Sequence, residues 1–336
     1  MSYDRLSSSS LRVVFMGTPH FAIPVLNALA EADGIDVCGV FTPPDRPGGR
    51  GRQPVPPPVK LHALDLGLAV HQPPTLRSGQ AQTLLASLKP DLIVVAAYGR
   101  FLPDPVLNLP RLGCLNIHPS LLPKHRGPSP VVTAILEGDS TTGVTLMLLD
   151  SGMDTGPLIA SRSFQMTGHE MAEGLTEELF QVGSALLLDN LGPWARDELV
   201  GKPQDEAGAT VTRKVEREDG RADWSLSALE LDRRCRAYNP WPGLYSQWDG
   251  KLLKLLDVAA SPAVSGAGMP TGSVVQLDGP NPLGVVTGDG VLELRSVQLE
   301  GRKSATSAEF LRGYPAFAGA LLDSGLPGKA PDADAN

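Results

Sequence analysis

The chain has 336 residues, a length that suits two domains better than one core. Hydrophobic residues make up 42% and charged residues 20%, which is ordinary for a globular protein, and no apolar run approaches the roughly 18 residues of a membrane span. The formal net charge of -8 argues against a general nucleic-acid binder, although net charge hides local patches.

Apolar strands alternate with helical segments over the first part of the chain. Strands are predicted at 11–16, 35–41, 68–71, 91–97, 115–118, 142–149 and 158–164, and helices at 59–65, 78–88, 128–137 and 170–191. A further helix is expected from Pro19, capped by Thr18, and a loop over 42–58. This alternation predicts an α/β domain over 11–192, with a Rossmann-like, mostly parallel sheet and helices on both faces.

The character of the sequence changes after this domain. Residues 193–209 are rich in Gly, Pro and polar side chains, which predicts a linker. Beyond it, a helix at 225–237 precedes short strands at 244–248, 251–258, 272–277, 283–287 and 291–297. Closely spaced strands between Gly and Pro turns predict a small C-terminal β-barrel of the OB type over 210–314. The tail 327–336 is expected to be disordered.

Two polar side chains stand at the end of a predicted strand. Asn116 and His118 alternate with Ile117, so in an extended strand they point to the same face. In α/β sheets, ligands bind outside the carboxyl ends of the strands. Asp154 follows in a glycine-bounded turn, and an amide, an imidazole and an orienting carboxylate suit acyl-group chemistry. Each residue taken alone could equally be structural.

Two basic segments could bind a charged ligand or simply face solvent. The loop 44–53 carries Arg46, Arg50 and Arg52, and arginines on a glycine-rich backbone suit phosphate binding. Lys124-His125-Arg126 is either a solvated charge run or a contact to an acidic ligand. The turn after the first strand lacks the GxGxxG cradle of a dinucleotide site.

Three isolated cysteines give neither a disulfide framework nor a metal site. Cys38, Cys114 and Cys235 have no CxxC spacing, which favours a reducing cytoplasm, and no metal is expected. The first ten residues lack the apolar core of a secretory signal, so no export is expected either.

Several motifs together identify a family. They are Gly-Thr-Pro at 17–19, Pro-Asp-Arg-Pro at 44–47, Asn-x-His-x-Ser-Leu-Leu-Pro at 116–123, Asp-Thr-Gly at 154–156, Asp-Trp-Ser at 223–225 and Asn-Pro-Trp-Pro at 239–242. With them the chain resembles, from Leu11 to about Gly313, the methionyl-tRNA formyltransferases among the formyltetrahydrofolate-dependent formyltransferases. Pro119 stands where that family often has Gly, and Lys124-His125 where it often has Arg-Trp.

The resemblance implies an activity and its residues. It implies formyl transfer from the co-substrate 10-formyltetrahydrofolate to the free α-amino group of methionyl initiator tRNA, by a monomer of the bacterial cytoplasm without membrane contact. The catalytic set would be Asn116, His118 and Asp154. The folate-site residues would be Ser120, Leu121, Leu122 and Pro123; tRNA would meet the C-terminal barrel and Arg46, Arg50 and Arg52.

The roles within the catalytic set stay open at this point. Asn116 and a protonated His118 would donate to the formyl oxygen as it gains negative charge. Asp154 would either orient His118 or help move the amine proton. Alternative activities are formyl transfer to a sugar-nucleotide amine or to glycinamide ribonucleotide, hydrolysis of 10-formyltetrahydrofolate, and tRNA binding without catalysis.

Overall fold

Residues 10–48, 53–261 and 268–323 are described by a computed structural model, which divides into two compact units. The first unit comprises the chain up to Val131 with 140–166 and 174–213, and the second comprises 132–139, 167–173 and the chain from Lys214. Residues 193–209, predicted to be a linker, therefore pack with the first unit. The predicted disordered tail, 327–336, lies outside the described residues.

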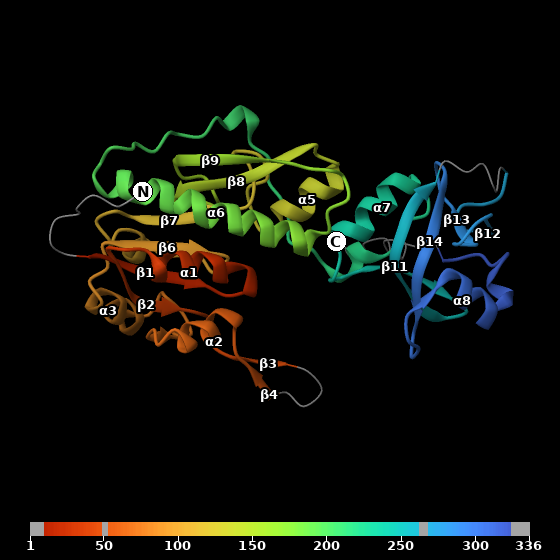
Figure 1. Ribbon diagram of the computed structural model, residues 1–336, viewed down its shortest axis with the longest axis horizontal. Helices are drawn as coiled ribbons and strands as arrows, with labels where there is room; N and C mark the ends of the chain where they lie inside the picture. The colour runs from red at the N-terminus through yellow and green to blue at the C-terminus, as the bar shows by residue number, and fades with distance from the viewer. Residues whose placement is uncertain (1–9, 49–52, 262–267, 324–336) are drawn as a thin grey trace, which may run out of the picture. The chain divides into compact units, whose positions relative to one another are not determined.

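The first unit is built on a seven-stranded sheet in the order β5-β2-β1-β6-β7-β8-β9 (Figure 1). Its strands are β1 (Leu11–Gly17), β2 (Ile35–Phe41), β5 (Val70–His71), β6 (Leu92–Ala96), β7 (Cys114–His118), β8 (Thr141–Leu148) and β9 (Leu158–Gln165). The neighbouring strands from β5 to β7 in this order pair in parallel, whereas β8 pairs antiparallel with both β7 and β9. The predicted parallel-dominated α/β sheet is confirmed.

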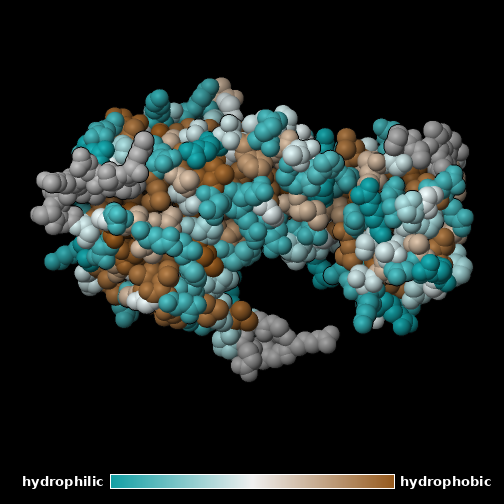
Figure 2. Space-filling view, in the orientation of Figure 1, coloured by the Kyte–Doolittle hydropathy of each residue, from teal (hydrophilic) through white to brown (hydrophobic). Residues whose placement is uncertain are grey.

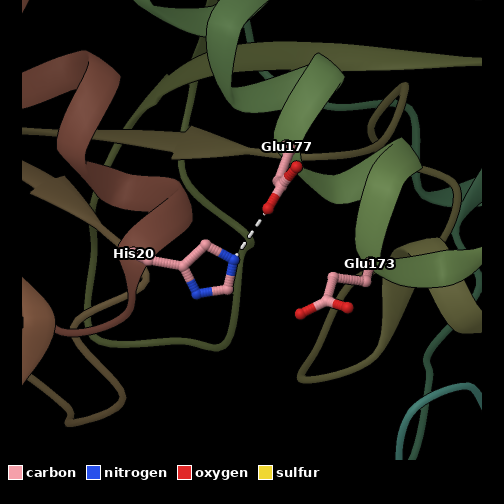
Figure 3. Close-up of side chains that lie close together, drawn as sticks. All are labelled: His20, Glu173 and Glu177. Atoms are coloured by element: carbon pink, nitrogen blue, oxygen red, sulfur yellow. Dashed lines mark hydrogen bonds and ion pairs between the residues drawn. The ribbon is translucent and has the colours of Figure 1, made fainter.

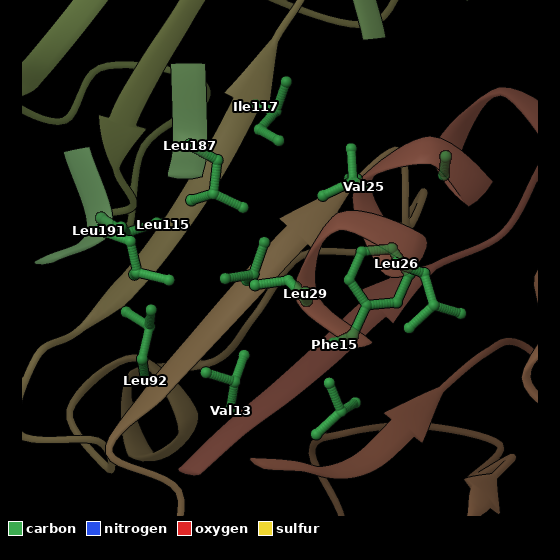
Figure 4. Packing of buried hydrophobic residues seen from close by; sticks show 14 of the residues in the cluster. Val13, Phe15, Val25, Leu26, Leu29, Leu92, Leu115, Ile117, Leu187 and Leu191 are labelled. Carbon is green, nitrogen blue, oxygen red and sulfur yellow. The ribbon is translucent and has the colours of Figure 1, made fainter. Parts of the chain in front are cut away.

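Helices cover both faces of this sheet because successive strand residues point to opposite sides. The helices are α1 (Ile23–Glu31), α2 (Pro58–Asp65), α3 (Gly79–Ser87), α4 (Asp104–Leu107) and α6 (Ala172–Ala195). The division between the units falls within α5 (Pro130–Glu137) and near the start of α6. Val13 and Phe15 pack with side chains of α1, α2 and α6, as Figure 4 shows in part. Val14 and Met16 pack on the other face with α3 and α4.

Phe15 provides a direct test of this core. Its side chain is fully buried, whereas Phe101 is 63% exposed. Phe15→Ala should lower the free energy of unfolding by about 3–5 kcal/mol, because it removes buried apolar contacts and leaves a cavity. Phe101→Ala is the matched control and should change it by less than about 0.5 kcal/mol. Denaturant unfolding measures both, and equal losses would contradict the packing.

Two local expectations were wrong, and one short helix was not predicted. Thr18 does not cap the first helix, because a 3₁₀ turn, η1 (His20–Ala22), precedes α1 and the N-cap positions fall on Pro19 and Ala22, with no side-chain cap hydrogen bond. The Thr18 hydroxyl instead donates to the Tyr98 carbonyl at 2.9 Å. The predicted loop 42–58 contains a hairpin, β3 (Arg46–Gly48) with β4 (Gln53–Val55). The short helix α4 lacks a periodic apolar pattern long enough to predict.

The second unit is built on an antiparallel sheet in the order β10-β11-β14-β13-β12, with β15 beside β14. Its elements are η3 (Arg217–Gly220), α7 (Ala228–Ala237), β10 (Leu244–Trp248), β11 (Lys251–Ser261), β12 (Val274–Gln276), β13 (Leu283–Val286), β14 (Val291–Leu299), β15 (Ala305–Thr306), α8 (Ser307–Gly313) and η4 (Pro315–Phe317). Trp224 is fully buried in its core. This is the expected barrel-type domain, with α8 and β15 as additions that the sequence did not predict.

Hydrophilic side chains cover much of the visible surface of the chain (Figure 2). Brown, apolar side chains gather on the first unit in the region of α1 and α2, and Leu61 and Leu64 of α2 are each about half exposed. Among the described residues, no helix is both long and apolar enough to cross a membrane.

Candidate active site

Asn116 and His118 lie at the carboxyl end of β7, beside the parallel strand β6. Leu115 and Ile117 pack into the core that contains α1 and α6. Because side chains alternate along a strand, Asn116 and His118 point to the opposite face. The predicted same-face arrangement of this pair is therefore present.

The hydrogen bonds of His118 define which ring nitrogen can exchange a proton. Nε2 lies 3.0 Å from the carbonyl oxygen of His125. A carbonyl only accepts, so Nε2 carries the hydrogen and donates it. Nδ1 faces the other way and lies 3.6 Å from Oδ2 of Asp154. In the neutral ring Nδ1 therefore holds the lone pair.

Burial and charge act in opposite directions on this imidazole. The His118 side chain is only 5% exposed. Burial lowers the pKa of His118, while the nearby Asp154 carboxylate raises it, and the net direction is downward. The resting ring is therefore neutral near pH 7, with Nδ1 free to accept a proton, which differs from the protonated donor expected from the sequence.

Asp154 reaches His118 from a tight turn between β8 and β9. Its own φ is +54°, a left-handed conformation that costs a non-glycine residue about 1–2 kcal/mol. Oδ2 accepts a 2.8 Å hydrogen bond from the Gly127 N–H, so the oxygen near the imidazole is held from a second side. At Gly156 a Cβ would lie 1.9 Å from the Leu148 carbonyl oxygen, so only glycine fits there.

Asn116 differs from its neighbours in having a free amide. The residue is half-buried, and its backbone pairs with Val95 and Met147. Within the described part of the chain, its side chain has no hydrogen-bond partner. A half-buried amide without a protein partner, beside a neutral imidazole, suits the oxygen of a bound ligand.

The loop after His118 is ordered by its own hydrogen bonds. The Ser120 hydroxyl donates to the Lys124 carbonyl at 2.7 Å, and Thr145 donates to the Ser120 carbonyl at 2.7 Å. Leu122 is 7% exposed, whereas Leu121 and Pro123 are half-buried. The Ser120 hydroxyl therefore shapes the turn, and the half-buried side chains are the ones that a ligand could contact.

Comparison with known proteins decides the family. The formyl transferase model matches residues 11–191, and the formyl transferase C-terminal domain model matches residues 214–315. A methionyl-tRNA formyltransferase of Chloroflexus aggregans is 46% identical over 91% of this chain and 98% of its own length. The protein of the same name from Dehalococcoides mccartyi is 43% identical over 94% and 99%. The chain belongs to the methionyl-tRNA formyltransferase family. It is an enzyme of formyl transfer.

More distant solved structures share the fold of this family. HypX from Aquifex aeolicus, solved in complex with tetrahydrofolic acid, matches 90% of this chain and 47% of its own, with a TM-score of 0.57 and 22% identity. WlaRD, a sugar 3N-formyl transferase, matches 88% of this chain and 100% of its own, with a TM-score of 0.59 and 17% identity. At these identities the likeness concerns the fold alone.

The predicted tRNA-binding arginines belong to the stretch of sequence that includes strands β3 and β4. Arg46 is exposed on β3, while Arg50 and Arg52 fall outside the described residues. The base of the hairpin is anchored by Asp45, whose two carboxylate oxygens each accept from Lys60 Nζ at 2.8 Å. This hydrogen bonding lowers the pKa of Asp45. The hairpin is thus presented from a fixed base.

The segment 124–126 is neither a solvated charge run nor a free basic patch. Arg126 is buried, and its guanidinium makes a bidentate ion pair with Glu206 at 3.0 and 2.8 Å. Its Nε donates to the Gln204 side chain at 3.0 Å. These partners could not be predicted from local sequence, because they lie about 80 positions away in a segment predicted to be a linker.

A second histidine–carboxylate pair lies on the surface of the first unit (Figure 3). His20 of η1 is 2.8 Å from Glu177 of α6, and both side chains are about half exposed. The neighbouring rings of Phe21 and Phe180 are 5.1 Å apart. The pair therefore joins η1 to α6, where a solvent-exposed ion pair contributes little stability.

Proposed function

We propose that the protein transfers the formyl group of 10-formyltetrahydrofolate to the α-amino group of methionyl initiator tRNA. The observation that carries the proposal is the free amide of Asn116 beside the His118–Asp154 pair at the carboxyl end of β7. The relatives named methionyl-tRNA formyltransferase over more than nine-tenths of the chain support the acceptor. This role belongs to translation initiation in the cytoplasm.

Asn116 stabilises the charge that develops in the reaction. As the amine attacks, negative charge grows on the formyl oxygen, and the amide N–H groups of Asn116 donate to it. A preorganised donor in a partly buried site costs little reorganisation, which is why such donors contribute strongly to catalysis.

His118 accepts the proton that the attacking amine must lose. Only Nδ1 can do so, because Nε2–H is donated to the His125 carbonyl. The imidazolium formed in this way is stabilised by the Asp154 carboxylate, 3.6 Å from Nδ1. Of the two roles open for Asp154 at the sequence level, we therefore favour stabilisation and orientation of His118.

The folate co-substrate supplies the activated formyl group. We place its binding beside the loop of Ser120, Leu121, Leu122 and Pro123, which directly follows His118 in the chain. The half-buried Leu121 and Pro123 offer an apolar contact for a flat ring, and the unpartnered Asn116 amide fits a bound carbonyl. These features fit a folate without requiring a metal among the catalytic groups named here.

The acceptor tRNA would contact the hairpin arginines and the second unit. We assign phosphate contacts to Arg46, Arg50 and Arg52, since each guanidinium can bind two phosphate oxygens. The Asp45–Lys60 anchor would hold the hairpin for this contact.

The Arg50 assignment predicts a change in salt dependence. Arg50→Ala should raise the KM for tRNA and lower the slope of log(kcat/KM) against log[salt] by about 0.7–0.9, the contribution of one phosphate contact. Steady-state kinetics at several salt concentrations measure this slope. Arg77, exposed in the first unit, provides the matched control Arg77→Ala. An unchanged slope in Arg50→Ala would contradict a phosphate contact by Arg50.

One assay separates the proposed function from its alternatives. Purified protein is incubated with 10-formyltetrahydrofolate and charged initiator tRNA, a sugar-nucleotide amine, or water alone. We expect formylated tRNA and little free formate. Formylation of the sugar amine, or formate release without tRNA, would support the corresponding alternative instead.

A further inference from the structure

The segment between the two family matches lies against the catalytic turns of the first unit. Within it, Lys202 and Leu158 exchange two backbone hydrogen bonds of 2.8 Å, which fix Lys202 beside the first residue of β9. Further along, Thr210 accepts from the Arg126 N–H at 2.9 Å, and Thr212 donates to the Arg126 carbonyl at 2.7 Å. The segment 202–212 therefore packs as part of the site rather than as a free connection.

Within this segment, Gln204 holds the backbone of the Asp154 turn. Its Nε2 donates to the carbonyl oxygens of Asp154 and Gly156, at 2.8 Å each. Its Oε1 accepts from Nε of Arg126 at 3.0 Å. A reversed amide would set its oxygen against two carbonyl oxygens, so the surroundings fix the side chain in one orientation.

The Asp154 turn needs such support. Asp154 has a left-handed backbone, and strained conformations persist only where the surroundings hold them. The carboxylate itself is held by one backbone N–H, that of Gly127. Gly127 has a φ of +103°, and a Cβ there would lie 2.8 Å from the Thr212 carbonyl oxygen. The segment 202–212 therefore contacts the backbone of the Asp154 turn through Gln204, and it packs against Gly127, whose N–H binds the Asp154 carboxylate.

Arg126 connects the loop that contains Gly127 to Gln204. It is 5% exposed, lies next to Gly127 in the chain, and bonds to Gln204 on the other side. Glu206 neutralises it through two hydrogen bonds and raises the pKa of Arg126. The network Glu206–Arg126–Gln204 therefore links the loop after His118 to the turn of Asp154.

We propose that Gln204 is a positioning residue, which holds the Asp154 turn so that the carboxylate stays beside Nδ1 of His118. The proposal rests on the proposed function only in assigning a catalytic role to that pair; the geometry stands independently of it. Gln204 touches neither reacting atom, so its loss acts through Asp154.

The kinetic test compares Gln204→Ala with a matched change outside the network. Gln181, exposed on α6, provides the control Gln181→Ala. Gln204→Ala should lower kcat about 10-fold, by analogy with the lower end of what loss of a supporting hydrogen bond costs at metal sites, with KM for both substrates nearly unchanged. The acid limb of its pH–rate profile should move to lower pH, because a displaced carboxylate no longer favours the imidazolium. Gln181→Ala should do neither.

A second measurement does not depend on the reaction. The imidazole resonance of His118, assigned by its loss in His118→Asn, is titrated by NMR in the wild type and both glutamine variants. A fall in the pKa of His118 in Gln204→Ala alone supports the proposal even if the enzyme used another acceptor. An unchanged pKa in a folded Gln204→Ala protein overturns it, whatever the activity.

A folding defect would not block the test. If Gln204→Ala does not fold, Gln204→Asn takes its place, because its amide is one methylene shorter and cannot reach both carbonyls while bonding to Arg126. Gln204→Asn with wild-type kcat, pH profile and His118 pKa would also overturn the proposal.

Discussion

Asn116→Ala should lower kcat for formyl transfer by about 10²–10³-fold, the usual cost of losing one preorganised donor to a developing oxyanion. The amide of Asn116 has no partner in the described part of the chain, so its removal leaves no buried group unsatisfied. Thermal unfolding and tRNA affinity should therefore stay close to wild type. Single-turnover kinetics with bound tRNA measure the chemical step directly.

A substitution of equal size separates the effect of losing the N–H donor from the effect of losing side-chain volume. Asn116→Asp preserves size but places a carboxylate, without N–H groups, beside the oxygen that becomes negative. Its kcat should fall at least as far as that of Asn116→Ala. Asn190→Ala removes an amide that only donates to the Leu186 carbonyl within α6, and should leave kcat unchanged. Near-wild-type turnover in Asn116→Asp would refute the role of the amide.

The sequence predicted those parts of the molecule that depend on local patterns. Alternation along 114–118 placed Asn116 and His118 on one face, and the fully apolar run of β6 predicted a buried parallel strand. Thr18 is not the cap that its local sequence predicts, because a 3₁₀ turn shifts the helix start, and its hydroxyl donates to a carbonyl 80 positions away, that of Tyr98. Periodicity contains no information on such distant pairs.

The same limit applies to the support of the site. Gln204 and Glu206 lie in a polar stretch whose composition is typical of a linker, and no local rule relates it to Arg126 or Asp154. The orientation of the His118 ring could not be predicted from the sequence either, because the partner of Nε2 is a backbone carbonyl, that of His125, in the turn that follows. What the sequence could supply was the residue types, and what the fold adds is which atom of each is free to react.

Asp154→Asn should change both the rate and its dependence on pH. Nδ1 of His118 works as a base only in the neutral ring, so activity falls as pH drops through the pKa of His118. Burial lowers this pKa and the Asp154 charge raises it, so removing the charge should lower the pKa of His118 further. The acid limb should therefore move to lower pH. At a pH above the pKa of His118 in both the wild type and the variant, kcat should fall by about 10²–10⁴-fold, because a base that is poorly stabilised when protonated transfers the proton less well.

A matched substitution lies in the same turn. Asp150 accepts from the Thr155 hydroxyl and the Gly152 N–H, so its charge faces the turn rather than the ring. Asp150→Asn should leave the acid limb in place. A limb that moves to higher pH in Asp154→Asn, or moves equally in both variants, would show that the carboxylate of Asp154 does not stabilise the imidazolium of His118.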